Sequence, residues 1–140
     1  MAQEPTLYPN LFPERYAREL ADATTDGATW ASAPSDAFEA LAKGGEPLVY
    51  VVTVDRNLTL SERVVGSRHA HHSVIAANQA VIAAGEVSLF VAGSDRIVLT
   101  LNERSGHYQP GRECLVGARE AFEQQGFWVP DDAVRSYTGD

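Results

Sequence analysis

The sequence has little of what would assign it to a specialised class of protein. Its 140 residues include one cysteine, Cys114, which excludes an internal disulfide and favours a reducing, cytoplasmic location. No apolar run approaches the roughly 20 residues that a membrane-spanning helix needs, so no membrane association is expected. The N-terminus has neither a basic start nor an apolar core, so no secretory signal is predicted.

Positive charge is also scarce. Eleven Lys and Arg residues stand against nineteen Asp and Glu residues, and the net charge is −8. A field of this sign repels nucleic acid at long range, so we do not expect a nucleic-acid partner. All the basic side chains except Lys43 are arginines, which suit the capture of carboxylates or phosphates. Codon bias of the genome explains the same preference for arginine. A small polar or anionic molecule is the ligand expected under the enzyme hypothesis given below.

A chain of this length is expected to form a single domain, 1–140. We expect a helical N-terminal part over 1–46, an antiparallel sheet over 47–109, and a helix with a polar tail over 110–140. Apolar spacing predicts short helices over 13–23 and 35–43, and a longer helix that begins at Pro110 and ends before Gly126.

Apolar and β-branched runs predict five strands at the centre of the chain, over 48–55, 58–65, 69–75, 81–91 and 96–102. Short connections between successive strands favour an antiparallel meander. The fold class that follows is α+β, in which a twisted sheet or partial barrel of about five strands is packed against the N-terminal helices and one C-terminal helix.

Alternation along the last two strands predicts which side chains share a face. If the alternating aliphatic residues of the two strands face each other, Val87 pairs with Leu99. Glu86 then lies on the opposite face of the sheet. The same rule, carried across the turn AANQA, places His72 on the face of Glu86 unless a bulge intervenes.

The stretch NERSGHYQP, residues 102–110, is the densest cluster of functional side chains. An imidazole exchanges protons near neutral pH, and a neighbouring phenol can donate to a developing anion. A second imidazole on a nearby strand would complete an acid and base pair around one substrate. The predicted catalytic residues are His72, Glu86, His107 and Tyr108. The predicted substrate-binding residues are Ser73, Arg96, Arg104 and Ser105.

The run HHSVIAANQAVIAAG, followed by SGHYQP and a helix, resembles the C-terminal domain of the plant IQ-motif-containing calmodulin-binding proteins and related fungal and bacterial domains. The resemblance covers roughly 48–134 and implies a fold and a site location rather than a reaction. The plant members carry a basic residue at the position of Glu86. No IQ motif is present, so calmodulin binding is not expected.

Three histidines, His69, His71 and His72, raise the question of a metal. Their spacing fits part of a cupin-like pattern, but the acid expected a few residues later is missing, so neither a metal nor another cofactor is predicted. The leading hypothesis is a small metal-independent enzyme that performs acid/base chemistry. The alternatives are a nuclease or toxin-type catalytic domain, and a binding module without turnover. A homo-oligomer is compatible with each.

Overall fold

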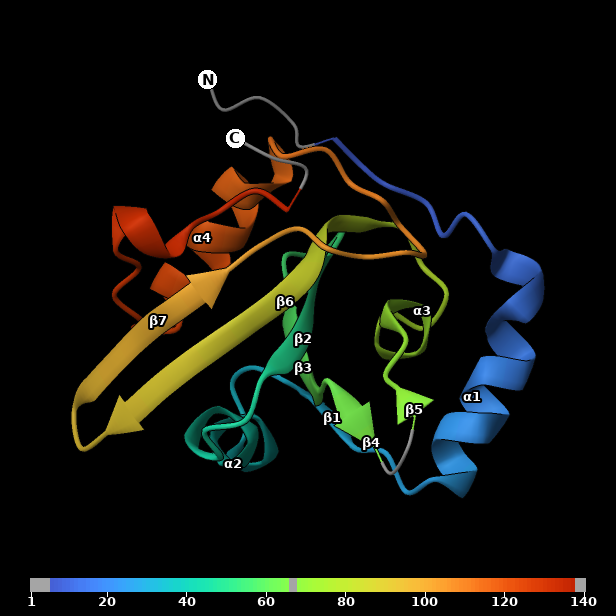
Figure 1. Ribbon diagram of the computed structural model, residues 1–140, viewed down its shortest axis with the longest axis horizontal. Coiled ribbons are helices and arrows are strands. Elements are labelled where there is room, and N and C mark those ends of the chain that lie inside the picture. The colour runs from blue at the N-terminus through green and yellow to red at the C-terminus, as the bar shows by residue number, and fades with distance from the viewer. Residues whose placement is uncertain (1–5, 66–67, 138–140) are drawn as a thin grey trace.

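The computed structural model describes residues 6–65 and 68–137, and it confirms the α+β class. A five-stranded antiparallel sheet carries helices on both faces (Figure 1). Its strands are β1 (Trp30–Ser32), β2 (Leu48–Thr53), β3 (Leu58–Glu62), β6 (Val81–Ala92) and β7 (Asp95–Leu101). A small ribbon is formed by β4 (Val64–Val65) and β5 (Arg68–His69). The helices are α1 (Tyr16–Thr25), α2 (Asp36–Lys43), α3 (His72–Ile75) and α4 (Cys114–Gln124). In the described part of the chain, none of these is long and apolar enough to cross a membrane.

The strands do not follow one another across the sheet in chain order. The order is β1-β3-β2-β6-β7, so the chain crosses from one side of β2 to the other between β3 and β6. Strand β2 is apolar at every position but the last and is buried on both faces. A strand of this composition needs neighbours on both sides, and it takes the centre of the sheet for that reason.

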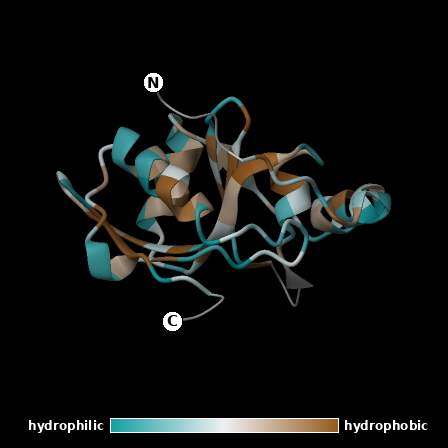
Figure 2. Ribbon diagram, turned by 90° about the horizontal axis from the view of Figure 1, so that it is seen from above, coloured by the Kyte–Doolittle hydropathy of each residue, from teal (hydrophilic) through white to brown (hydrophobic). Residues whose placement is uncertain are grey.

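Two apolar clusters lie on opposite faces of β2. Leu48, Tyr50 and Val52 pack with α2 and α4, whereas Val49 and Val51 pack with α3. Figure 1 shows the same division, with α4 on one side of the sheet and α3 and α1 on the other. In Figure 2 the hydrophobic colour falls on strands of the sheet and on parts of the helices beside it. The candidate site described below belongs to the α3 side.

The N-terminal part is helical as expected, but it also supplies a strand. A 3-10 turn over Pro13–Arg15 leads into α1, and the Ser35 hydroxyl caps α2 by accepting from the Phe38 amide at 3.1 Å. Strand β1 lies between these helices and pairs with β3, with Trp30 opposite Ser61. Three residues are too few to show a strand period in the sequence.

The strand predicted over 69–75 is wrong. Residues 68–69 form the short strand β5, and His72–Ile75 form the single-turn helix α3, all four residues of which are buried. The β-branched Val74 and Ile75 favoured a strand. Burial between α1 and the sheet overrides that preference, and Ala77 and Asn78, both with positive φ, return the chain to β6.

The predicted register of β6 and β7 is also wrong. Val87 pairs with Leu101 rather than Leu99. The hairpin shifts the pairing by one residue, since Leu89 lies opposite Val98, and one extra residue in β7 shifts it by one more. The extra residue, Leu99, is 52% exposed. Glu86 nevertheless lies on the face opposite Val87, as predicted, since Val87 belongs to the cluster under α4 and Glu86 pairs with Val49.

The C-terminal helix begins at Cys114, four residues later than predicted, and Gly126 follows its end with φ +83°. The segment beyond it lies along the edge of the sheet. Trp128 donates its amide to the Arg96 carbonyl and accepts from the Val98 amide, at 2.8 and 2.9 Å. The C-terminal part therefore completes the side of the sheet away from the candidate site.

Candidate active site

A pocket of about 230 Å³ opens on the α3 side of the sheet. Its polar walls are formed by His71, His72, His107, Arg63, Glu86 and Arg104. Three of the four residues predicted to be catalytic thus line one concavity, although they come from the start of α3, the middle of β6 and the loop after β7.

Glu19 of α1 organises one wall of this pocket. Its Oε2 lies 2.6 Å from Nε2 of His107, and its Oε1 accepts from the Ser73 hydroxyl at 2.9 Å. A carboxylate is an acceptor, so Nε2 of His107 carries the hydrogen and Nδ1 remains for a second partner. The His107 carbonyl also accepts from the Leu11 amide at 2.7 Å, and this bond joins the segment before α1 to the loop.

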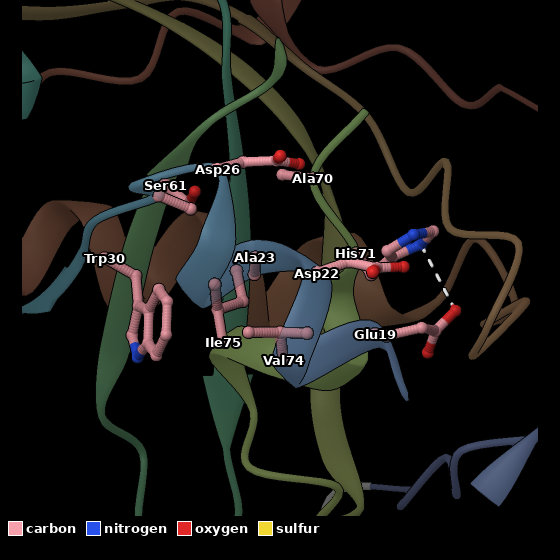
Figure 3. A pocket seen from close by; sticks show the side chains of 11 residues that line it. Glu19, Asp22, Ala23, Asp26, Trp30, Ser61, Ala70, His71, Val74 and Ile75 are labelled. Carbon is pink, nitrogen blue, oxygen red and sulfur yellow. Dashed lines mark ion pairs between the residues drawn. The ribbon is translucent and has the colours of Figure 1, made fainter. Parts of the chain in front are cut away.

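His71 completes a cluster around Glu19. Its Nδ1 lies 3.4 Å from Glu19 Oε2, and its ring centroid is 5.0 Å from that of His107. Figure 3 shows the pair of Glu19 and His71 at the edge of a smaller adjoining hollow, which His71 shares with the main pocket. One ligand atom from each of Glu19, His71 and His107 lies within 4.8 Å of the others.

This cluster differs from the histidine run that the sequence singled out. His71 belongs to it, but the Nε2 atom of His72 is turned to the sheet, and the side chain of His69 lies outside the described part of the chain. The acid absent after the histidines in the sequence is supplied by Glu19, more than fifty residues earlier in the chain.

His72 is buried and points its Nε2 at the Gly85 carbonyl, 2.8 Å away. Burial lowers the pKa of His72 to about 4, so the ring is neutral at pH 7. A carbonyl only accepts, so Nε2 carries the hydrogen and Nδ1 keeps a lone pair. His72 is therefore held in one tautomer.

Glu86 faces the pocket from β6 as an ion pair rather than as a lone carboxylate. Its Oε2 lies 3.0 Å from Nε of Arg63, and its Oε1 accepts from Asn102 Nδ2 at 3.3 Å. The Asn102 side-chain oxygen accepts in turn from the amides of Glu86 and Arg104, at 3.0 and 2.9 Å. These bonds hold the end of β7 against β6 and set the position of Arg104, whose guanidinium lies over the Tyr137 ring.

Tyr108 is not at the pocket. It is a core residue, and its hydroxyl donates to the Gln79 carbonyl at 2.7 Å. Burial raises the pKa of the Tyr108 phenol above its ordinary value, which suits a structural hydrogen bond rather than proton transfer. The neighbouring Ser105 does line the pocket, and its Oγ accepts from the Tyr108 amide at 3.3 Å.

Two of the residues predicted to bind substrate have other positions. Ser73 is fully buried and contacts Glu19 rather than the pocket. Arg96 lies along the β6–β7 hairpin, where it binds both carboxylate oxygens of Glu39, at 2.5 and 3.1 Å. Its guanidinium also covers the Phe127 ring at 4.3 Å. The sequence alone could not reveal these contacts of Arg96, because Glu39 and Phe127 come close to the hairpin only in the folded chain.

Comparison with protein-family models, curated proteins and solved structures finds no match to the chain. The resemblance to the plant calmodulin-binding proteins stays a prediction.

The sequence interpretation missed Glu19, Arg63 and the role of His71. A signal for Glu19 exists, because it lies within the inward stripe that Tyr16, Leu20 and Ala23 form on α1. A charged residue in such a stripe is buried when the helix packs, and a buried charge needs partners. Nothing comparable marks Arg63, whose place next to Glu86 depends on the crossing from β3 to β6.

Proposed function

We propose that the pocket is the active site of a small enzyme that performs proton-transfer chemistry on a small polar or anionic substrate. The observation that carries the proposal is the convergence of His72, Glu86 and His107 on one concavity, with Nε2 of His107 held 2.6 Å from a buried carboxylate. An imidazole held by a carboxylate is a common way of orienting a catalytic acid or base.

In this proposal the two imidazoles have different tasks. Glu19 orients His107, so that Nδ1 of that ring exchanges a proton with the substrate. His72 is neutral, and its Nε2–H is held by Gly85, so its remaining nitrogen accepts a hydrogen bond or a proton. Each ring then keeps one nitrogen with a lone pair, and His107 becomes a donor once its Nδ1 has taken a proton from the substrate, with the Glu19 carboxylate beside its other nitrogen.

The size and charge of the pocket favour a small substrate. Its volume of about 230 Å³ is below the roughly 300–1,000 Å³ of sites that take drug-sized ligands. Arg104 lines it, and its guanidinium is suited to a carboxylate or phosphate. Arg63 is already paired with Glu86, so a bound anion would have to share the Arg63 guanidinium with that carboxylate.

The test is a search for turnover followed by one substitution. The protein is incubated in D₂O with a mixture of small carboxylic acids and phosphate esters, and proton NMR follows both ester cleavage and hydrogen–deuterium exchange at carbon. We expect turnover that falls by about 100-fold or more in His107→Gln, because Gln cannot transfer the proton. Glu123→Gln on α4, outside the pocket, is the matched control.

The melting temperatures of both variants are measured alongside. If His107→Gln keeps the wild-type rate while remaining folded, the proposal is wrong. Binding of a mixture component at the pocket without turnover would favour the binding module instead, and cleavage of RNA would favour the nuclease. Both alternatives stay predictions.

A further inference from the structure

We propose that Glu19, His71 and His107 form a binding site for a divalent transition-metal ion. The three residues come from α1, from the position before α3 and from the loop after β7. These three segments lie far apart in the chain. In the fold they bring one carboxylate oxygen and two ring nitrogens within 4.8 Å of one another. In the described part of the chain, this is the one group of three that can hold a metal.

The distances are close to those of a bound ion. Ligand atoms about 2.0–2.2 Å from Zn²⁺ lie roughly 3.0–3.5 Å apart in a tetrahedral or octahedral arrangement. Glu19 Oε2 is 2.6 Å from His107 Nε2 and 3.4 Å from His71 Nδ1. All three ligand atoms lie within 4.8 Å of one another, so an ion would draw the His71 and His107 nitrogens together and separate the closest pair slightly. The His71 side chain is 40% exposed, so its movement would not disturb the core.

Two of the three ligands are already held in place. The side chains of Glu19 and His107 are 11% and 12% exposed. The Ser73 hydroxyl occupies Oε1 of Glu19 and leaves Oε2 for an ion. Partners of this kind, which fix a ligand without touching the metal, strengthen metal affinity. The Phe12 ring packs edge-on against the His107 ring, with centroids 5.8 Å apart, and limits its rotation.

The donor set indicates the class of metal. Imidazole nitrogens favour zinc, iron, copper and nickel over Mg²⁺ and Ca²⁺, which prefer oxygen ligands. Two histidines and one carboxylate are also the protein ligands of catalytic zinc sites and of non-haem iron sites that keep open positions for water or substrate. Here His71 and His107 both line the pocket of about 230 Å³, which has room for such further ligands.

The inference does not rest on the proposed function, because ion binding is measured without a substrate. The two proposals use His107 differently. A bound ion takes the place of the hydrogen on His107 Nε2, whereas proton transfer through His107 alone needs no ion. Activity after metal removal therefore separates them.

The experiment uses untagged protein treated with a chelator. Zn²⁺ is titrated near neutral pH in competition with a chromophoric chelator, and Co²⁺ is added separately to follow its visible absorption. We expect one ion per chain in the wild type. Loss of an outer partner weakens metal sites by about 10–100-fold, so Glu19→Gln, which removes a ligand, should weaken Zn²⁺ binding by about 100-fold or more. His71→Gln should do the same.

The matched control is Glu86→Gln, which neutralises a carboxylate of the same pocket outside the cluster and should bind Zn²⁺ with wild-type affinity. His71 is partly exposed, so its variant should fold even if Glu19→Gln does not. If the wild type binds no ion, or if His71→Gln and Glu19→Gln bind it unchanged, the metal site is wrong. If an ion binds but the protein shows no turnover with or without it, the proposed function is wrong and the metal site stands.

Discussion

At the scale of single residues, Glu19 has the largest effect on the site. Its two carboxylate oxygens contact Ser73, His107 and His71, so one buried charge joins α1, α3 and the loop after β7. A buried carboxylate without partners is costly, and these contacts offset that cost. The same contacts place the ring nitrogens that both proposals need.

Cys114 supports a prediction at this scale. It is buried at the start of α4, and burial raises the pKa of its thiol to about 12. At pH 8 only roughly one thiol in ten thousand is then ionised. We expect a thiol reagent to label the folded protein about 100-fold more slowly than the urea-unfolded protein. Labelling is followed by mass spectrometry, and similar rates in both states would contradict the burial of this thiol.

At the scale of elements, the site depends on how closely β6 approaches the end of β7. A Cβ on Gly85 would lie 1.9 Å from the Asn102 carbonyl oxygen. That oxygen also accepts from the Tyr50 hydroxyl at 2.8 Å, and the Asn102 amide donates to the Glu86 carbonyl at 3.0 Å. The glycine allows two backbones to meet where His72 and Glu86 are positioned.

We therefore expect Gly85→Ala to lower the free energy of unfolding by roughly 3 kcal/mol, because the added methyl group meets backbone that must shift. Urea unfolding measures this. Gly106→Ala is the matched control, since a Cβ there meets nothing within 4 Å, and its unfolding free energy should stay close to the wild-type value. If Gly85→Ala and Gly106→Ala have equal free energies of unfolding, the backbone of β6 moves away from Asn102 at little cost in free energy, and the prediction is wrong.

The β6–β7 hairpin supports another prediction at this scale. Arg96 ties the hairpin to α2 through Glu39 and to the end of α4 through the Gln125 carbonyl. We expect Arg96→Gln to lower the free energy of unfolding by about 1–2 kcal/mol, since it loses charge-assisted hydrogen bonds. Its Zn²⁺ affinity should equal that of the wild type. If Arg96→Gln instead weakens Zn²⁺ binding or lowers turnover while its stability stays unchanged, Arg96 acts in the site, as the sequence had predicted.

At the scale of the whole molecule, the candidate site lies where α1, α3 and the loop after β7 meet the face of the sheet away from α4. The larger cluster under α2 and α4 contains most of the buried hydrophobic residues. The smaller cluster beneath α3 leaves room for polar side chains at its edge. Separation of the larger core from the pocket explains why the Arg96→Gln variant is expected to change stability without changing ion binding.

The convergence of His72 and Glu86 was predicted for the wrong reason. Strand alternation placed them on one face, but His72 lies on a helix above the sheet and reaches β6 through the Gly85 carbonyl. The prediction succeeded because both residues belong to the same side of β2. It could not extend to Tyr108, because the direction of that side chain depends on the turn that precedes Pro110.

By itself the sequence determined the fold class, the short helices α1 and α2, the central position of β2, and the strands β6 and β7. These follow from local composition and period, which act over a few residues. Only the tertiary structure decided the strand order, the extra residue at Leu99 and the cluster of Glu19, His71 and His107. Each of these depends on contacts between segments far apart in the chain, and the free energy of such contacts outweighs local preference.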